Sequence, residues 1–121
     1  MLALIFDVET TGLPKRKKAE ISDFDNWPHI VQISWLVFNV TNGKIISIND
    51  HVISLQEGIK IPETSIKVHG ITNEIMEEKG ENIIDILMKF NNDLMESQII
   101  VAHNIDFDET IIGVESLRWL D

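Results

Sequence analysis

The sequence contains no cysteine, and this absence excludes disulfide bonds, thiol catalysis and cysteine-ligated zinc. It also lacks any apolar run approaching the roughly 18–20 residues that a membrane-spanning helix requires. The first residues, MLALIFD, lack the basic segment with which a secretory signal peptide begins. We therefore expect a cytoplasmic protein that does not contact a membrane. Its length suffices for one globular domain spanning residues 1–121.

Positive charge is also scarce, with 10 basic against 20 acidic residues and a net charge of −10. A uniformly acidic surface repels nucleic acid. Four of the basic residues nevertheless stand together as Lys15, Arg16, Lys17 and Lys18. A solvated loop, a contact for a phosphate backbone and a nuclear import signal all use such a run. The sequence leaves these three interpretations open.

What the chain does contain is a set of short apolar segments separated by turns and amphipathic stretches. Strands are predicted at residues 2–6, 30–40, 45–55 and 98–103, and helices at residues 83–95 and from about residue 107. The Asn42-Gly43 pair between the second and third strands is typical of a hairpin turn. The continuous apolar run of the first strand indicates burial on both faces. This order predicts a mixed α/β sheet that opens with an antiparallel hairpin and is flanked by helices.

Two helix starts carry capping signals. Thr72 is a candidate N-cap, and Glu74 stands in the first turn after it, where the helix dipole favours a carboxylate. Asp106 and Glu109 are three residues apart and match an N-cap aspartate followed by a glutamate at position N3 of the last helix. Capping explains Asp106 better than metal binding does.

Two carboxylates follow the first apolar run, in the segment IFDVETTGL at residues 5–13. Because side chains alternate along a strand, Asp7 and Glu9 share one face at its carboxyl end, which is where ligands gather in open α/β sheets. Two such carboxylates repel each other unless one is protonated or a cation lies between them. Oxygen ligands alone favour Mg²⁺ or Mn²⁺ over zinc. For this pair alone, an aspartate and a glutamate that merely flank a turn are the simpler interpretation.

A second acidic segment, VAHNIDFDE at residues 101–109, also follows an apolar strand and opens a helix. Asp108 falls near the second helical position, where the helix dipole favours a carboxylate. Capping alone therefore accounts for this residue too. Each of the two acidic segments is a weak signal when taken singly.

Taken together, three ordered motifs resemble those of the DEDD-type 3′–5′ exonucleases, in the histidine-containing branch that includes the proofreading subunit of bacterial DNA polymerase III. They are FDVETTGL at residues 6–13, VHGIT at 68–72 and VAHNIDFD at 101–108, and the resemblance extends from residue 2 to about residue 117. It implies a ribonuclease H-like fold and two-metal hydrolysis of phosphodiester bonds at the 3′ ends of DNA, in proofreading or repair. The implied partners are a single-stranded 3′ end and a DNA polymerase, and the implied cofactor is Mg²⁺ or Mn²⁺.

The resemblance also assigns residues. It makes Asp7, Glu9 and Asp108 the catalytic metal ligands. Substrate contacts fall to the backbone of Thr10 at the terminal sugar, Leu13 as a wedge against the last bases, His69 in the nucleotide pocket and Asn104 near the scissile phosphate. Local interpretations exist as well: ordinary turn packing for Leu13, a backbone-satisfied loop histidine for His69 and a turn cap for Asn104.

The third motif of the family is missing from the chain. It supplies a general-base histidine and a fourth carboxylate five residues apart, whereas the last histidine here is His103 and the one aspartate after Asp108 is Asp121. A C-terminally incomplete exonuclease-like domain, of which these residues form the N-terminal portion, is one explanation, and a short protein completed by another chain is a second. A positioned base accelerates such a step about 10²–10⁴-fold, so we expect little exonuclease activity from the 121-residue chain alone.

Other functions stay open at this point. An exonuclease that trims RNA 3′ ends would use the same ligands, and an inactive relative would serve as a non-catalytic module that binds a polymerase or a nucleic acid. An acidic α/β domain that binds no metal is a further interpretation. An incomplete sheet would also expose an edge, with apolar surface near Ile111, Ile112 and Leu117, and this favours self-association.

Overall fold

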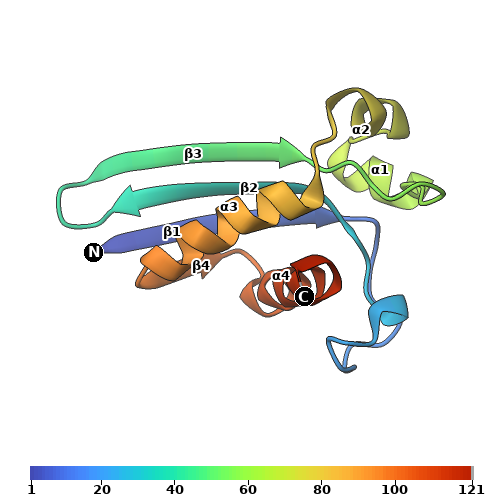
Figure 1. The fold of residues 1–121 in the computed structure, drawn as a ribbon, viewed down its shortest axis with the longest axis horizontal. Coiled ribbons are helices and arrows are strands. Elements are labelled where there is room, and N and C mark those ends of the chain that lie inside the picture. Colours follow the sequence, from blue (N-terminus) through green and yellow to red (C-terminus); the bar gives the residue numbers. More distant parts are fainter. Residues whose placement is uncertain (121) are drawn as a thin grey trace.

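The computed structural model describes residues 1–120 and shows a four-stranded sheet with helices packed against it (Figure 1). The strands are β1 (Leu2–Thr10), β2 (Ile30–Asn39), β3 (Lys44–Val52) and β4 (Ile99–Ala102). The helices are α1 (Glu63–His69), α2 (Asn73–Lys79), α3 (Ile83–Glu96) and α4 (Ile105–Leu120), and a 3₁₀ turn, η1, covers Phe24–Asn26. The sheet order is β3-β2-β1-β4, in which β2 is antiparallel to both neighbours and β4 is parallel to β1. This confirms the predicted mixed sheet with its antiparallel hairpin and flanking helices.

The first strand is longer than the sequence indicated. β1 continues past residue 6 to Thr10 because β2 pairs with its whole length, including Asp7 and Glu9. The prediction ended the strand where the continuous apolar run ends, but alternation continues through Val8, which is buried. Asp7 and Glu9 therefore belong to a paired strand whose register with β2 shifts only after Glu9, and the alternation of side chains along it sets the direction of both.

β2 and β3 form the predicted hairpin, with residues 40–43 as its loop. The Asn39 side chain accepts a hydrogen bond from the Thr41 amide at 3.0 Å, and the Gly43 amide donates to the Asn39 carbonyl at 2.8 Å. Gly43 has a φ of 72°, a left-handed conformation that glycine adopts without strain. The Asn42-Gly43 signal is thus confirmed, although β3 ends at Val52, before the predicted residue 55.

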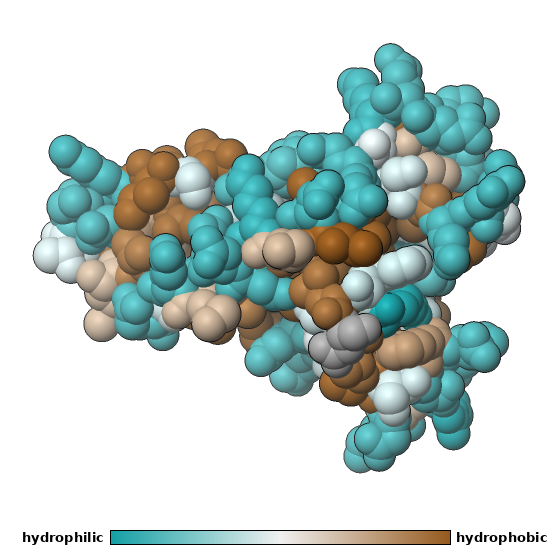
Figure 2. Space-filling model, in the orientation of Figure 1, coloured by the Kyte–Doolittle hydropathy of each residue, from teal (hydrophilic) through white to brown (hydrophobic). Residues whose placement is uncertain are grey.

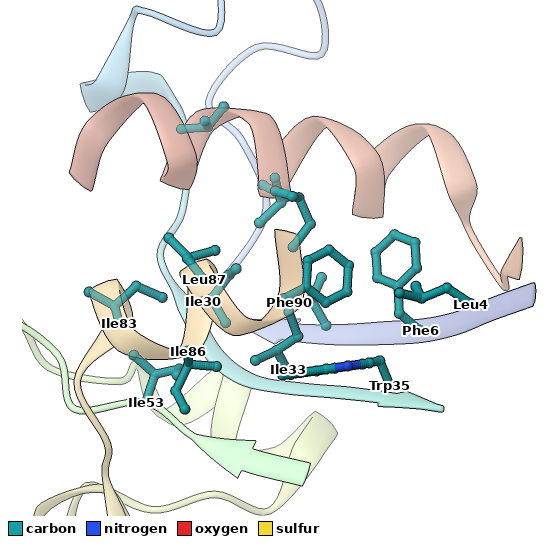
Figure 3. Packing of buried hydrophobic residues seen from close by; sticks show 14 of the residues in the cluster. Leu4, Phe6, Ile30, Ile33, Trp35, Ile53, Ile83, Ile86, Leu87 and Phe90 are labelled. Carbon is teal, nitrogen blue, oxygen red and sulfur yellow. The ribbon is translucent and has the colours of Figure 1, made fainter. Parts of the chain in front are cut away.

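The hydrophobic core lies on one face of the sheet, beneath α3 and α4 (Figure 3). Leu4 and Phe6 of β1 belong to it, and the Phe90 ring of α3 packs edge-on against Phe6 and Trp35, with ring centroids 5.2 Å apart in both pairs. Such edge-to-face contacts add to the stabilisation that burial of the rings provides. A second cluster joins α1 and α2 to β2, and its buried members are Val31, Ile61, Ile71 and Met76.

The opposite face of the sheet is open in the described residues, so the predicted burial of the first strand on both faces is wrong. Ile5 of β1 is 43% exposed, Ile48 of β3 is 72% exposed and Val101 of β4 is 45% exposed. Asp7 lies on the same face as Ile5, because alternate residues of a strand share a face. A continuous apolar run does not reveal that both long helices pack on the other side.

The helix starts agree only in part with the capping signals. The Thr72 hydroxyl accepts a hydrogen bond from an amide of the first turn at 3.1 Å, which confirms it as the N-cap of α2. The Asp106–Glu109 capping pair is wrong, because α4 begins one residue before Asp106. The first helical hydrogen bond runs from the Asp108 amide to the Asn104 carbonyl at 2.9 Å, so Asn104 holds the N-cap position.

The apolar residues of α4 do not form the exposed surface that the sequence indicated. Ile111 is fully buried and Ile112 is 6% exposed, because both belong to the core between α4 and the sheet, and Leu117 is half-buried. Asp121 lies outside the described residues. No helix within residues 1–120 combines the length and the apolar character needed to cross a membrane.

Candidate active site

The three predicted metal ligands lie where β1 and α4 meet. Asp7 and Glu9 extend from the open face of β1, and Asp108 lies in the first turn of α4. Because β4 runs parallel to β1, both strands end at the same edge of the sheet, and the chain enters α4 there. Asp108 is only 3% exposed, whereas Asp7 is exposed to solvent.

The three carboxylates are close enough to perturb one another. Burial, and then the negative charge of Asp7, raise the pKa of Asp108 from 3.8 to about 6; Glu9 adds to this rise and the Asn104 backbone opposes it. Burial and Asp7 also raise the pKa of Glu9, an effect that His69 opposes. The Oδ2 atom of Asp108 is buried and has no hydrogen-bond partner among the described residues. A bound cation would neutralise this excess of negative charge.

The donor atoms here are all carboxylate oxygens, which suit Mg²⁺ or Mn²⁺. Across residues 1–120, however, no group of three or more acidic or histidine side chains is arranged closely enough to hold a metal ion. The structure therefore brings Asp7, Glu9 and Asp108 within electrostatic range but not into a closed set of ligands. Asp7 is exposed and Glu9 is partly exposed, so both side chains have room to turn toward an ion.

A well-fixed turn follows the two carboxylates of β1. The Thr10 hydroxyl donates to the Gly12 carbonyl at 2.7 Å, and the Ser65 hydroxyl of α1 donates to the Thr11 carbonyl at 2.7 Å. On the other side, the Thr11 amide donates to the His29 carbonyl at 2.9 Å. Helix α1 and the segment before β2 thus hold residues 10–12 from two sides.

A cavity of about 430 Å³ opens beside this turn, and its volume lies within the range of small-ligand sites. Three of the predicted substrate residues, Thr10, Leu13 and His69, line it together with Glu9. Leu13 is 86% exposed, so it stands at the rim. The other lining residues are Val8, Gly12, Thr64, Ser65, Val68 and Phe107. Asn104 does not line the cavity, so the structure does not bring it to the other predicted substrate residues.

His69 ends α1 with one ring nitrogen bonded and the other unpartnered. Its Nδ1 accepts a hydrogen bond from the Ile71 amide at 3.0 Å, so a neutral ring carries its proton on Nε2. Nε2 is buried and has no partner in the part of the chain that the structure describes. The backbone-satisfied interpretation therefore accounts for only half of the ring, because the buried Nε2 remains without a partner.

Sequence reasoning did not identify Ser65, Val68 and Phe107 as site residues. Val68 and Phe107 adjoin predicted residues within their motifs, and this adjacency is the signal that could have found them. Ser65 had no such signal, because its role depends on a bond to Thr11, which lies 54 positions earlier in the chain.

Known proteins share this sequence pattern. The sequence model of the RNase_T family, described as an exonuclease, matches residues 4–120. The PolC-type DNA polymerase III of Listeria monocytogenes is 32% identical over 109 residues, which cover 90% of this chain and 6% of that protein. The DNA polymerase III subunit epsilon of Buchnera aphidicola is 29% identical over 114 residues, which cover 93% of this chain and 43% of that protein. The chain thus spans less than half the length of either relative.

Solved structures share the fold. E. coli Exonuclease I in complex with a 5cy-dA13 oligonucleotide aligns with 97% of this chain and 24% of its own, with a TM-score of 0.77 at 16% identity. The apo form of Exonuclease I aligns over the same 97% of this chain with a TM-score of 0.72. These likenesses confirm the ribonuclease H-like fold, and exonucleases of this kind generally use divalent metal ions. Because the family match covers nearly the whole sequence, the chain belongs to the RNase_T exonuclease family.

Proposed function

We propose that this chain acts on the 3′ ends of single-stranded DNA as part of a metal-dependent exonuclease. The observation that carries the proposal is the buried, unpartnered Oδ2 of Asp108 beside Asp7 and Glu9, with Glu9 in the wall of the cavity. E. coli Exonuclease I has been solved with dA13 and dT13 oligonucleotides, and its shared fold supports single-stranded DNA as the substrate. The polymerase III relatives support a role in proofreading and a DNA polymerase as partner.

Asp7, Glu9 and Asp108 would hold Mg²⁺ or Mn²⁺, which when bound supply an activated water and stabilise the leaving 3′ oxygen. The chain itself contributes the placement of negative charge, since β1 sets Asp7 and Glu9 on one face and α4 sets Asp108 beside them. Because the pKa of Asp108 is raised to about 6, this carboxyl releases its proton only as the solution approaches neutral pH. Metal binding and loss of this proton are therefore coupled.

The cavity offers contacts for the terminal nucleotide. Val68 and Phe107 provide apolar surface for a base, since bases stack on aromatic rings. His69 lines the cavity, and its Nε2 has no hydrogen-bond partner among the described residues. The Thr10 hydroxyl is already bonded within the turn, so this residue meets a sugar through its backbone. The exposed Leu13 stands where a strand would leave the cavity, and there it would separate the last two bases.

The test follows a 5′-labelled single-stranded oligonucleotide in the presence of Mn²⁺. We expect metal-dependent binding of its 3′ end and slow shortening from that end. Both readouts should be lost in Asp7→Asn and Asp108→Asn. Asp106→Asn is the matched control, because it neutralises an exposed carboxylate in the same helical turn as Asp108. Binding and shortening that survive in Asp108→Asn would refute the proposal, and a preference for a matched RNA strand would redirect it to RNA trimming.

Binding of 3′ ends with only slow hydrolysis is a second candidate, because no histidine follows Asp108 in the sequence. His29, His51 and His69 each have one ring nitrogen engaged by a neighbour, whereas His103 is exposed and lies near Asp108. A base positioned at the attacking water is worth about 10²–10⁴-fold in rate. The 121-residue chain should therefore bind 3′ ends and cleave them slowly. Rapid release of mononucleotides that is unchanged in His103→Gln would contradict this candidate.

A further inference from the structure

We propose that the loop of residues 14–29, which joins β1 to β2, is a second contact for nucleic acid. Through Lys15, Lys17 and Lys18 it binds the phosphate backbone on the 5′ side of the terminal nucleotide. This inference rests on the proposed function for the identity of the polymer. The loop projects from the carboxyl end of β1 beside α4 (Figure 1). Hydrophilic side chains surround its outer end (Figure 2).

Hydrogen bonds within the loop hold it in one shape. The Asn26 side chain is buried, and its Oδ1 accepts from the Arg16 amide at 2.8 Å while its Nδ2 donates to the Arg16 carbonyl at 3.1 Å. The Lys15 amide donates to the Asn26 carbonyl at 2.9 Å. The Trp27 indole donates to the Glu20 carbonyl at 3.0 Å. These bonds close the basic segment against η1 and fix the backbone at Lys15 and Arg16, directly before Lys17 and Lys18.

Helix α4 anchors the base of the loop. The Arg118 guanidinium donates to the Phe24 carbonyl at 2.8 Å and to the Trp27 carbonyl at 3.1 Å, and it is also bonded to Glu115. Asp108 stands in the first turn of the same helix. Helix α4 therefore sets the position of the loop relative to Asp108. Two contacts can bind two parts of one substrate only if the spacing between them is fixed in this way.

The loop begins where the nucleotide cavity ends. Gly12 and Leu13 line that cavity and also a neighbouring cavity of about 280 Å³, whose wall includes Lys15 and Asn26. A continuous surface thus leads from the first cavity, past Leu13, to the first lysine of the loop. Lys17 follows Leu13 by four residues, so their Cα atoms are at most about 14 Å apart, a distance that a few nucleotides span.

The three lysines are uncompensated positive charges in an acidic chain. Arg16 is paired with Asp23 at 2.8 Å, whereas no carboxylate of the described residues forms an ion pair with Lys15, Lys17 or Lys18, and all three are exposed. With a net charge of −10, the rest of the surface repels a polyanion. A solvated loop or a nuclear import signal would contain the same residues, but neither requires a loop clamped beside the nucleotide cavity.

The experiment measures how salt weakens the binding of a fluorescent single-stranded oligothymidylate. Each lysine–phosphate contact on a single strand contributes about 0.7 to the slope of log K against log salt concentration. The triple variant Lys15→Gln/Lys17→Gln/Lys18→Gln should therefore have a slope shallower by about 2. Between about 50 and 200 mM salt, the wild-type affinity should fall about 20-fold more than the affinity of this loop variant.

The matched control is Lys44→Gln/Lys79→Gln/Lys89→Gln, which removes the same charge from exposed positions on β3, α2 and α3. The control should keep the wild-type slope, because these lysines lie outside the loop. Equal slopes in the wild-type chain and in the loop variant would overturn the proposed contact. An equal decrease of the slope in both triple variants would also overturn it, since the effect would then come from total charge alone.

A mononucleotide separates this inference from the proposed function. We expect thymidine 5′-monophosphate to occupy the cavity without reaching the loop, so its Mn²⁺-dependent affinity should be the same in the wild-type chain and in the loop variant. If the mononucleotide binds, and the salt dependence of oligothymidylate binding has the same slope in the wild-type chain and in the loop variant, the loop contact is wrong and the proposed function stands. If the mononucleotide does not bind and the loop variant still lowers the slope, the proposed function is wrong and the loop contact stands.

Discussion

Replacement of Arg118 by methionine should destabilise the chain far more than the same change at an ordinary surface arginine. The Arg118 side chain is 9% exposed and pairs with Glu115, whose side chain is 2% exposed. It also donates to the carbonyls of Phe24 and Trp27 and to the Nδ1 of His29, the last at 3.0 Å. Burial, and then the charge of Arg118, lower the pKa of His29 to about 4, so its ring is neutral and Nδ1 accepts the bond.

The expected loss of stability can be worked out from these contacts. Removal of one partner from a buried ion pair costs about 3–5 kcal/mol, because the other charge is left buried without compensation. Glu115 keeps a hydrogen bond from the Ile30 amide at 3.2 Å, so we expect the lower end, about 3 kcal/mol. Arg16→Met is the matched control. Its pair with Asp23 is 68% and 41% exposed, and such pairs contribute about 0–1 kcal/mol.

The loss of stability in Arg118→Met should also depend on pH. Burial raises the pKa of Glu115, and the substitution removes Arg118, which opposes that rise. A carboxyl whose folded pKa exceeds its unfolded value destabilises the fold as the pH rises from the unfolded value toward the folded one. The deficit should therefore be smaller below about pH 4 than at neutral pH. Urea unfolding followed by tryptophan fluorescence measures it. A loss equal to that of Arg16→Met, or one that is the same at both pH values, would refute the reasoning.

In metal-free buffer above neutral pH, Asp108→Asn should raise the free energy of unfolding by about 1–3 kcal/mol, because folding raises the pKa of this buried carboxyl from 3.8 to about 6. The gain should vanish below about pH 4, where the carboxyl is protonated in both states, and a gain that persists there in urea titrations would count against this cause. Thr72→Ala should lower stability by about 1 kcal/mol through loss of the N-cap bond, and an unchanged urea midpoint would exclude that contribution. Leu13→Ala should change stability by less than about 0.5 kcal/mol, since the side chain is 86% exposed, and yet weaken 3′-end binding about 10-fold by anisotropy. Equal binding would remove Leu13 from the site.

Local patterns were sufficient to predict much of the fold. Apolar runs rich in β-branched and aromatic residues located β2 and β3, Asn42-Gly43 located their hairpin, and helical spacing located α3. The end of β1 was not predictable in this way, because it depends on pairing with β2 over the whole strand. The exposure of Ile5 and the burial of Ile111 were also beyond local patterns, since both depend on which face of the sheet the helices cover.

In the site, the motifs predicted Asp7, Glu9 and Asp108 as metal ligands, and the structure places all three at one edge of the sheet. The clamp formed by Arg118 and Glu115 was not predicted. Opposite charges three residues apart on a helix resemble an ordinary exposed pair, and the backbone carbonyls that Arg118 binds lie 91 and 94 positions earlier in the chain. Only the tertiary fold shows that this pair is buried and that it anchors the loop.

The most direct test of the central claim, that Asp7, Glu9 and Asp108 form a cation site, is a calorimetric titration of Mn²⁺ into the 121-residue chain above neutral pH. Asp7→Ala and Asp106→Asn are titrated beside the wild-type chain. We expect equal binding by the wild-type chain and Asp106→Asn, and loss of binding in Asp7→Ala. Absence of binding in the wild-type chain, or equal binding in Asp7→Ala, would contradict the claim.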